Sequence, residues 1–410
     1  MSCQSAPKIL RRINALAKIS EEPGKLTRTF ASPAMRRANE LVASWMREAG
    51  MKTRVDTIGN LTGHYAGKNP DAKILLFGSH LDTVRNAGKF DGPLGVLLAI
   101  ALVENLHRQK IKLPFAIEVI GFADEEGVRF QTAYLGSKTL AGSFDLRDLK
   151  RKDADGISLA DAIKNFGGNP VKLKSAALNP KNLLGYVEAH IEQGPVLENK
   201  NLAVGIVSAI AGQTRAKITF TGRAGHAGTT PMNLRRDALV GVAEFILSAE
   251  ALARKISSLV ATVGQIKAEP GASNVIPGEA RLTLDLRHAN DSVRKNALKK
   301  LKLFAQQIAA RRKLKLRFEI VHETAAVNCS EKFSRLLAKS VLRHQKKVLH
   351  LSSGAGHDAA VMAKICPAAM LFIRCKNGVS HNPAESVKLT DMRVAVEVLA
   401  DFIQTLAKEQ

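Results

Sequence analysis

Aromatic residues, cysteines and long apolar runs are all scarce in this chain, and each scarcity narrows the possible functions. Phe, Trp and Tyr make up only 5% of the 410 residues, too little for an obvious surface on which nucleic-acid bases stack. The longest apolar run, residues 94–103, is about half of the roughly 20 residues that a membrane-spanning helix requires. We therefore interpret this run as a buried helix and expect neither a membrane nor a nucleic-acid partner.

The four cysteines form no CxxC pair, and two of them lie in apolar surroundings. Such thiols are most simply reduced and buried, as in a cytoplasmic protein. Residues 1–20 lack the apolar core of a secretory signal, although their basic and acid-poor composition also suits an organelle-targeting segment. The stretch is more simply an amphipathic helix, and we predict a cytoplasmic protein. The cysteines are Cys3, Cys329, Cys366 and Cys375.

The net charge is strongly positive, +24 from 61 basic and 37 acidic residues. Such a charge attracts nucleic acids, anionic surfaces or small anionic substrates. The basic residues are scattered, with modest clusters only at residues 295–304, 310–318 and 343–347, so solvated helix faces explain most of them. A nucleic-acid-binding protein is a remote alternative, which tight, salt-sensitive DNA binding without metal-dependent hydrolysis would support.

Two apolar runs predict strands that are buried on both faces. Residues 72–80 and 115–127 are continuous apolar stretches, and both end in polar residues. Such strands are typical of a parallel sheet covered by helices, whose ligands gather at the carboxyl ends of the strands. Before them, Ser32, Pro33 and Gly50 mark the start and the stop of a helix.

From about residue 211 the apolar pattern changes from continuous to alternating. Strand-helix-strand-strand-helix-strand is the order expected there, which is that of a ferredoxin-like unit. After about residue 326 the continuous apolar pattern returns, as expected for strands buried on both faces. We therefore predict an α/β protein in which residues 1–210 and 327–410 form a catalytic domain around a helix-covered mixed sheet. Residues 211–326 form an inserted ferredoxin-like α+β domain, a lid or dimerisation domain.

Polar residues at the ends of the predicted buried strands are the candidates for chemistry. Each alone is more simply a hydrogen-bonding or turn residue, but together they supply imidazoles and carboxylates, the ligands that zinc, manganese and cobalt share. The three adjacent acids of residues 124–126 also repel one another unless a positive charge lies nearby. We therefore predict a two-metal hydrolytic site. Its candidates are His80, Asp82, Asp91, Glu125, Glu126, His190 and His381.

Six segments carry a family resemblance. Residues 78–96, 124–142, 188–198, 222–239, 353–359 and 380–385 resemble, in order, the signature blocks of the allantoate amidohydrolase and N-carbamoyl-L-amino-acid hydrolase family. This family is a branch of the two-metal aminopeptidase-like hydrolases. The resemblance runs from about residue 30 to the C-terminus, and no expected metal ligand is missing.

The resemblance implies a role for each candidate in the predicted catalytic domain. Asp91 would bridge two divalent ions (zinc, manganese or cobalt). His80 and His190 would complete one site, and Glu126 and His381 the other. Asp82 would orient the ring of His80, and Glu125 would be the general base.

The resemblance also implies roles for residues of the inserted domain. His226 would stabilise the oxyanion in a neighbouring subunit, which implies a homodimer, although a plain tight turn is the alternative. Arg287 would clamp a substrate carboxylate together with Asn274, although a solvated arginine is the simpler alternative. Weaker candidates for the substrate pocket are Gln193, Gln213 and His357.

The expected substrate is a small anionic ureido compound. The resemblance ranks allantoate first, with release of ammonia and carbon dioxide, and N-carbamoyl-L-amino acids second. β-Ureidopropionate and ureidoglycolate follow, and a related two-metal peptidase or N-deacylase is a further alternative. The metal ligands are common to all of these enzymes, so they do not discriminate between the substrates.

Overall fold

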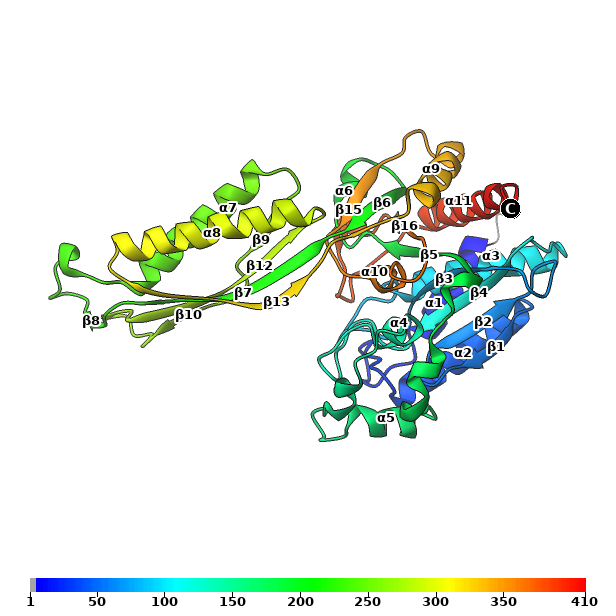
Figure 1. Cartoon of the computed structure of the whole chain (residues 1–410), viewed down its shortest axis with the longest axis horizontal. Coiled ribbons are helices and arrows are strands. Elements are labelled where there is room, and N and C mark those ends of the chain that lie inside the picture. Colours follow the sequence, from blue (N-terminus) through cyan, green and yellow to red (C-terminus); the bar gives the residue numbers. More distant parts are fainter. Residues whose placement is uncertain (1–4) are drawn as a thin grey trace. The chain divides into compact units, whose positions relative to one another are not determined.

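The apolar run at residues 94–103 lies within α3 (Pro93–Arg108), a helix that is buried along most of its length. The structure is a computed structural model that describes residues 5–410. The chain forms two compact units, shown in Figure 1. The main unit comprises the chain up to Ser208 together with Cys329–Leu351 and Ala355–Gln410, and the inserted unit comprises Ala209–Asn328 and Ser352–Gly354.

A nine-stranded mixed sheet forms the centre of the main unit. Its strands lie in the order β1-β2-β4-β3-β5-β16-β6-β14, and β15 lies beside β6. The four strands β4, β3, β5 and β16 are parallel to one another, so their carboxyl ends meet at one edge of the sheet. The strands are β1 (Lys52–Val55), β2 (Leu61–Tyr65), β3 (Ile74–His80), β4 (Ala116–Phe122), β5 (Leu183–Ile191), β6 (Val204–Ile210), β14 (Val327–Asn328), β15 (His350–Ser353) and β16 (Ala368–Ile373).

The largest hydrophobic core lies between this sheet and five helices, including α3. In α2, the side chain of Ser32 accepts a hydrogen bond from Met35 N, Pro33 is the first residue, and Gly50 follows with a φ of +80°, as predicted. The other four helices are α1 (Ser5–Leu16), α2 (Pro33–Glu48), α9 (Glu331–His344) and α11 (Leu389–Ala407). Shorter helices are α4 (Leu135–Leu140), α5 (Leu159–Asn165), α6 (Val196–Asn199) and α10 (Asp358–Met362).

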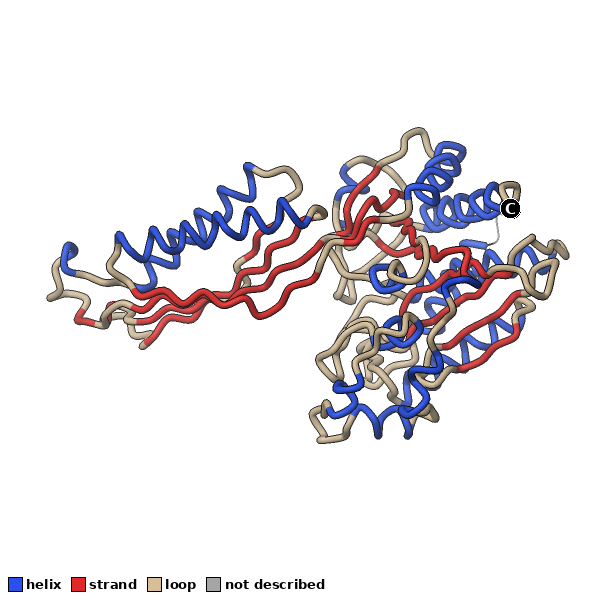
Figure 2. Tube along the Cα trace, in the orientation of Figure 1, coloured by secondary structure: helices blue, strands red, loops and turns tan. Residues whose placement is uncertain are grey.

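The inserted unit has the predicted ferredoxin-like order of elements. Figure 2 shows its helices lying along its strands. Its antiparallel sheet has the order β10-β12-β7-β13, with β9 beside β12, and two helices cover one face around Phe220 and Leu284. These elements are β7 (Gly212–Thr221), α7 (Ala238–Lys255), β9 (Val260–Thr262), β10 (Ile266–Glu269), β12 (Glu279–His288), α8 (Asp291–Arg311) and β13 (Lys315–Thr324). The short strands β8 (Gly225–His226) and β11 (Val275–Ile276) pair separately.

One predicted strand of the inserted unit is divided in two. Residues 259–266 read as a single strand in the sequence, but β9 ends at Thr262 and β10 starts at Ile266. The register explains the break, because three residues, 263–265, lie opposite only two residues of β12. This extra residue is a bulge, and Gly264 lies at its centre.

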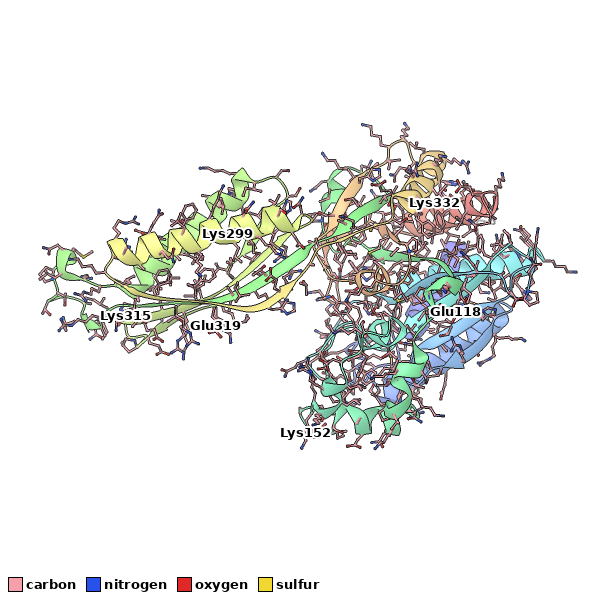
Figure 3. All side chains as sticks on the ribbon, in the orientation of Figure 1. Glu118, Lys152, Lys299, Lys315, Glu319 and Lys332 are labelled. Carbon is pink, nitrogen blue, oxygen red and sulfur yellow. The ribbon has the colours of Figure 1, made fainter. Side chains whose placement is uncertain are left out.

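The basic residues at the surface and the helix near the N-terminus agree with the sequence predictions. Lys152, Lys299, Lys315 and Lys332 are exposed and extend away from the ribbon in Figure 3, as expected for scattered solvated charge. The predicted amphipathic helix near the N-terminus is α1, whereas Cys3 lies outside the described residues. Within residues 5–410, no helix combines the length and the apolar character needed to cross a membrane.

Candidate metal centre

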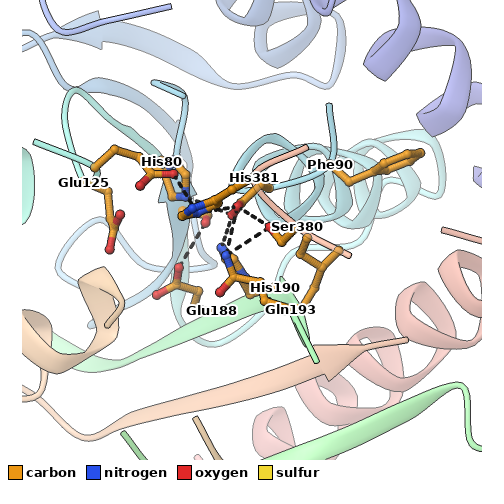
Figure 4. A network of polar contacts seen from close by, with 12 residues as sticks. His80, Phe90, Glu125, Glu188, His190, Gln193, Ser380 and His381 are labelled. Carbon is orange, nitrogen blue, oxygen red and sulfur yellow. Dashed lines mark hydrogen bonds and ion pairs between the residues drawn. The ribbon is translucent and has the colours of Figure 1, made fainter. Parts of the chain in front are cut away.

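The parallel strands of the main unit bring the predicted ligands to one edge of the sheet. His80 is the last residue of β3, His190 lies one residue before the end of β5, and Glu126 follows β4. His381 lies in the loop after β16, and Asp91 lies in the loop between β3 and α3. Residues separated by up to 301 positions in the sequence therefore meet, as Figure 4 shows for His80, His190 and His381.

The Asp91 carboxylate lies at the middle of this group and is buried. Its Oδ1 is 3.1 Å from His190 Nε2 and 3.6 Å from His80 Nε2. Its Oδ2 is 3.2 Å from His381 Nε2, which is itself 3.4 Å from Glu126 Oε1. Each Asp91 oxygen thus belongs to a separate three-residue group with the spacing of metal ligands. This is the arrangement of a carboxylate between two cation sites.

The hydrogen bonds of the two buried rings indicate that a cation fits between them. His80 Nδ1 lies 3.0 Å from the carbonyl oxygen of Asp82, and His190 Nδ1 lies 2.9 Å from that of Ile191. A carbonyl only accepts, so Nδ1 carries a hydrogen in either charge state, and in the neutral form of each ring the Nε2 lone pair is directed toward Asp91 Oδ1. Asp91 Oδ1 is buried and has no partner in hydrogen-bond geometry. The residues therefore fit a divalent ion with nitrogen and oxygen ligands.

In the metal-free protein, protons on the imidazole rings supply the positive charge that metal ions would otherwise provide. The contacts with Asp91 and Glu126 raise the pKa of His381 to about 10. Burial opposes the charge of His80, but its contacts with Asp82 and Asp91 raise the pKa of this ring well above its usual value. Burial likewise favours protonated Asp91, yet the three imidazoles outweigh it and hold the pKa of this carboxyl well below its usual range.

Asp82 has a broader role than orienting His80. Its carboxylate oxygens accept hydrogen bonds from the backbone N–H groups of Glu125 (3.0 Å) and Glu126 (3.1 Å). Its Oδ1 lies 3.5 Å from His80 Nδ1, which is farther than its own carbonyl oxygen. Asp82 therefore orients the ring mainly through its backbone, and its side chain holds the loop that carries both glutamates.

Glu125 lies beside the ligand groups and is buried. Its carboxylate, His80 and Glu126 offer atoms within 4.8 Å of one another. Burial, together with the charges of Glu126, Asp358 and Asp82, raises the pKa of Glu125 well above its usual value, although His80 acts in the opposite direction. A carboxylate with a raised pKa is a stronger base than an ordinary carboxylate.

Two of the predicted pocket residues belong to the metal centre itself. Gln193 Nε2 donates to Asp91 Oδ2 at 2.9 Å, so this side chain contacts the central carboxylate. His357 precedes α10 and is buried, with its ring centroid 4.6 Å from that of His190. Burial and the neighbouring His190 lower the pKa of His357 well below its usual value. His357 is therefore a neutral ring packed behind the ligands.

The four candidates in the inserted unit form two separate groups. Arg287 makes a bidentate contact with Asp285, at 2.8 and 3.0 Å, and Gln213 Nε2 donates to the same carboxylate at 2.7 Å. His226 pairs with Val275 across β8 and β11, and the carbonyl of the adjacent Asn274 accepts from Ala227 N at 2.9 Å.

The expected clamp of Arg287 with Asn274 is not formed within one chain. Asn274 lies shortly before the start of β12, whereas Arg287 is the ninth residue of this ten-residue strand. At about 3.3 Å per residue, the two ends of β12 lie roughly 27–30 Å apart.

Three residues of the centre were missed in the sequence. Ser380 Oγ donates to Asp91 Oδ2 at 2.7 Å, and Glu385 accepts from Asp91 N at 3.1 Å. Glu188, fully buried in β5, accepts a hydrogen bond from Ser79 Oγ at 3.0 Å. Glu188, His190 and His357 also offer candidate ligand atoms within 4.8 Å of one another. Their only signal was a place inside motifs already singled out, residues 188–198 and 380–385.

Comparison with known proteins agrees with this geometry. A model of the peptidase family M20/M25/M40 matches residues 76–405, and the chain belongs to this family. It is 42% identical over 402 residues to an N-carbamoyl-L-amino acid amidohydrolase of Geobacillus stearothermophilus, covering 98% of both chains. It is 40% identical over 442 residues to allantoate deiminase 1 of Glycine max, covering 98% of this chain and 90% of the relative.

A solved structure extends the similarity to the whole fold. The crystal structure of an amidase of the hydantoinase/carbamoylase family from Burkholderia multivorans matches 98% of both chains, with a TM-score of 0.92 and 32% identity. The predicted resemblance is therefore confirmed, and so are the predicted fold class and enzyme class, since the curated relatives are named as hydrolases of carbon–nitrogen bonds outside peptides.

Proposed function

We propose that this protein is a metal-dependent amidohydrolase that cleaves the carbamoyl group of allantoate and releases ammonia and carbon dioxide. The observation that carries the proposal is the buried Asp91 carboxylate, with His80 and His190 near one oxygen and His381 and Glu126 near the other. The similarity to a plant allantoate deiminase supports the substrate. The slightly greater identity to a bacterial N-carbamoyl-L-amino acid amidohydrolase supports the second candidate, hydrolysis of N-carbamoyl-L-amino acids.

Two zinc, manganese or cobalt ions would be held by His80, His190, Asp91, Glu126 and His381. When bound, such ions acidify water and polarise the ureido carbonyl, a poor electrophile because of its resonance. Glu125 removes the proton of the attacking water and then donates it to the departing nitrogen. Its burial and raised pKa support this role.

The Arg287 cluster is suited to a substrate with a carboxylate. Arg215 Nε lies 3.2 Å from Asp285, which also binds Arg287. These three residues line a groove on the face of the inserted sheet opposite the helices. The two guanidinium groups outweigh the one carboxylate, and Lys217 adds further positive charge in the same groove, which suits an anionic group such as a substrate carboxylate. Gln213, which donates to Asp285, orients the same cluster.

A homodimer is part of the proposal. His226 and Asn274 lie at the opposite end of the inserted unit from Arg287, so two copies of the chain are needed if all three are to serve one substrate. His226 of one copy then stabilises the oxyanion formed in the other. An exposed apolar stripe on α7, with Leu239, Ala243 and Leu247 at a spacing of four residues, supports a second copy as the partner.

A cytoplasmic location completes the proposal. Among the described residues, Cys329, Cys366 and Cys375 are free thiols. Burial raises the pKa of each thiol, to about 11 for Cys329 and Cys375 and about 12 for Cys366. Unreactive, unpaired thiols are typical of proteins kept in a reducing compartment.

The test is ammonia release from a panel of ureido acids after reconstitution with each metal. The chelated protein is the control. We expect metal-dependent release from allantoate that exceeds release from N-carbamoyl-L-amino acids, β-ureidopropionate and ureidoglycolate. Faster ammonia release from one of the other ureido acids would show that this compound, and not allantoate, is the preferred substrate. Turnover of peptides or acyl-amino acids without any ureidase activity would overturn the proposal.

A further inference from the structure

Glu385 ends the motif SHNPAE, and the proposed function assigns it no role. Its side chain is buried, with 3% of its surface exposed. Glu385 Oε1 accepts hydrogen bonds from Phe90 N at 2.7 Å and from Asp91 N at 3.1 Å. These two amides belong to the loop that presents the central carboxylate, so Glu385 holds the backbone of Asp91 directly.

The other oxygen of Glu385 leads to the side chain of Asp91. Ser380 Oγ lies 3.0 Å from Glu385 Oε2 and 2.7 Å from Asp91 Oδ2, and Figure 4 shows Ser380 within the network. Ser380 also precedes His381. Glu385 and Ser380 thus form a bracket, here called the Glu385 bracket, between the loop of Asp91 and the loop of His381, which are about 290 residues apart.

The close approach of Gly88 to the Glu385 side chain is independent evidence that the fold fixes the position of Glu385. A Cβ atom at Gly88 would lie 2.3 Å from Glu385 Cδ and 2.4 Å from its Cβ. The φ of Gly88 lies outside the left-handed region, so close approach rather than an unusual backbone conformation requires glycine here. The loop before Asp91 therefore has no room for a side chain at the point where Glu385 packs against it.

We propose that Glu385 is a positioning residue for the metal centre. By fixing the backbone of Asp91 and, through Ser380, its carboxylate, Glu385 keeps one oxygen directed at His80 and His190 and the other at His381. The inference rests on the proposed function for its metals, but it concerns metal retention rather than the choice of substrate. Loss of the bracket lets the central carboxylate rotate, which weakens both cation sites together.

The experiment compares metal affinity among four variants of the bracket and one control variant, all in the full-length protein. Zn²⁺ and Mn²⁺ affinities are measured by competition with a fluorescent chelator, and metal content by elemental analysis after dialysis. Glu385→Ala should lower the affinity by about 10–100-fold, the range typical of residues that orient metal ligands. Gly88→Ala, which displaces the glutamate without removing it, should do the same. Ser380→Ala should have a smaller effect, because the backbone contacts of Glu385 survive.

Glu385→Gln tests whether these hydrogen bonds are the cause. Glutamine keeps an acceptor for the two N–H groups and offers a donor to Ser380 Oγ, whose own proton goes to Asp91. We expect it to retain affinity within a few-fold of the unmodified protein. On the substrate turned over best, Glu385→Ala should lower kcat and leave KM nearly unchanged, because the substrate clamp lies in the inserted unit.

The matched control is Asp56→Ala. Asp56 also holds a loop of the main unit, by accepting from the backbone N–H groups of Ile58, Gly59 and Asn60. This variant should lower the melting temperature without changing metal affinity. Wild-type affinity in both Glu385→Ala and Gly88→Ala, equal loss in Asp56→Ala, or a glutamine variant as weak as alanine would each overturn the proposal. An inactive wild-type enzyme that binds metal tightly, with weak binding in Glu385→Ala, would overturn the function and leave the bracket standing.

Discussion

At the scale of single residues, the centre depends on which ring nitrogens carry hydrogens. Backbone carbonyls hold Nδ1 of His80 and His190, which leaves Nε2 for Asp91 and a cation. His381 differs, because its side chain is half exposed and its backbone has a φ of +55°, a rare conformation for a residue other than glycine. Two ligands are therefore held within the sheet, and the third is held by a strained loop.

Metal binding is expected to release protons and to tighten as the pH rises. His381, with a pKa of about 10 in the metal-free protein, is protonated at neutral pH and must lose its proton to bind a metal. The association constant for Zn²⁺ should thus increase at least about tenfold per pH unit between pH 6 and 8. Calorimetry in buffers of different ionisation enthalpy measures the released protons. A constant affinity over this range would contradict the assignment of His381.

The same pKa predicts how the metal-free protein responds to pH. The pKa of His381 is raised on folding, so its ion pairs stabilise the fold fully below about pH 6.5, the ordinary value for histidine. This contribution is lost as the pH rises through about 10. Thermal unfolding of the chelated protein should accordingly show that His381→Ala lowers the melting temperature at pH 6 but has little effect above pH 10.

Glu125→Gln should separate chemistry from metal binding. Glutamine keeps the shape of the side chain but neither accepts nor donates the transferred proton, so kcat should fall by about 100–10,000-fold while metal content is unchanged. Glu118→Gln is the control, since Glu118 is a buried glutamate of β4 that pairs with Arg54 away from the ligands. Turnover that persists in Glu125→Gln would show that another group is the base.

At the scale of elements, the close packing of α3 on the sheet supports the ligands from behind. A Cβ at Gly95 would lie 2.1 Å from the carbonyl oxygen of Ala189 and 3.0 Å from the side chain of Ser79. Each of these residues immediately precedes a histidine of the centre. The contact therefore couples the position of α3 to that of both rings.

Gly95→Ala should push α3 away from β5 and destabilise the main unit. Overpacking of this kind costs about 1–3 kcal/mol, and the contact with a backbone carbonyl places this site at the upper end of the range. Differential scanning calorimetry measures the loss. Gly264→Ala is the control, because the nearest atom to its added Cβ is 3.8 Å away. Equal melting temperatures for the two variants would contradict the packing argument.

The sequence predicted most of these helices and strands, but it did not predict the contacts between them. The alternating pattern after about residue 211 predicted strands such as β12, in which Leu282, Leu284 and Leu286 are buried, and the apolar run predicted α3. The bulge that separates β9 from β10 was missed, because it depends on the register against β12. Likewise, the sequence suggested Gln193 only as a pocket candidate, and the contact of its amide with Asp91 emerged from the fold.

At the scale of the whole molecule, the decisive question is whether one chain or two build a site. His226 and Arg287 lie at opposite ends of the inserted unit, and the proposal assigns them to one substrate from two copies. Leu247, with 66% of its surface exposed on α7, lies on the surface that the proposal assigns to the second copy. Leu247→Glu should therefore favour the monomer in sedimentation velocity, with Lys299→Glu on the exposed face of α8 as the control.

Mixing two inactive variants tests the shared site. In a mixed dimer of His226→Ala and Arg287→Ala chains, one site has its own Arg287 and the other chain's His226, and the second site lacks both. After dissociation and random reassembly, about a quarter of wild-type activity should return. If both residues served the site of their own chain, mixing would restore no activity. Each variant alone, treated identically, is the control.

The sequence by itself determined the types of residue at the strand ends and the order of the elements. Both follow from local periodicity, because apolar runs predict buried strands and the residues after them must lie at the edge of the sheet. That rule selected the seven candidates at the strand ends, and the family resemblance then assigned five of them, His80, Asp91, Glu126, His190 and His381, as metal ligands.

Tertiary structure alone decided the contacts among residues far apart in the chain. The position of Glu385 beside Gly88 and the hydrogen bonds of Ser380 and Gln193 to Asp91 belong to this class. Each depends on how closely two loops approach. Local sequence patterns carry no information on those distances, since they arise only when the sheet has assembled.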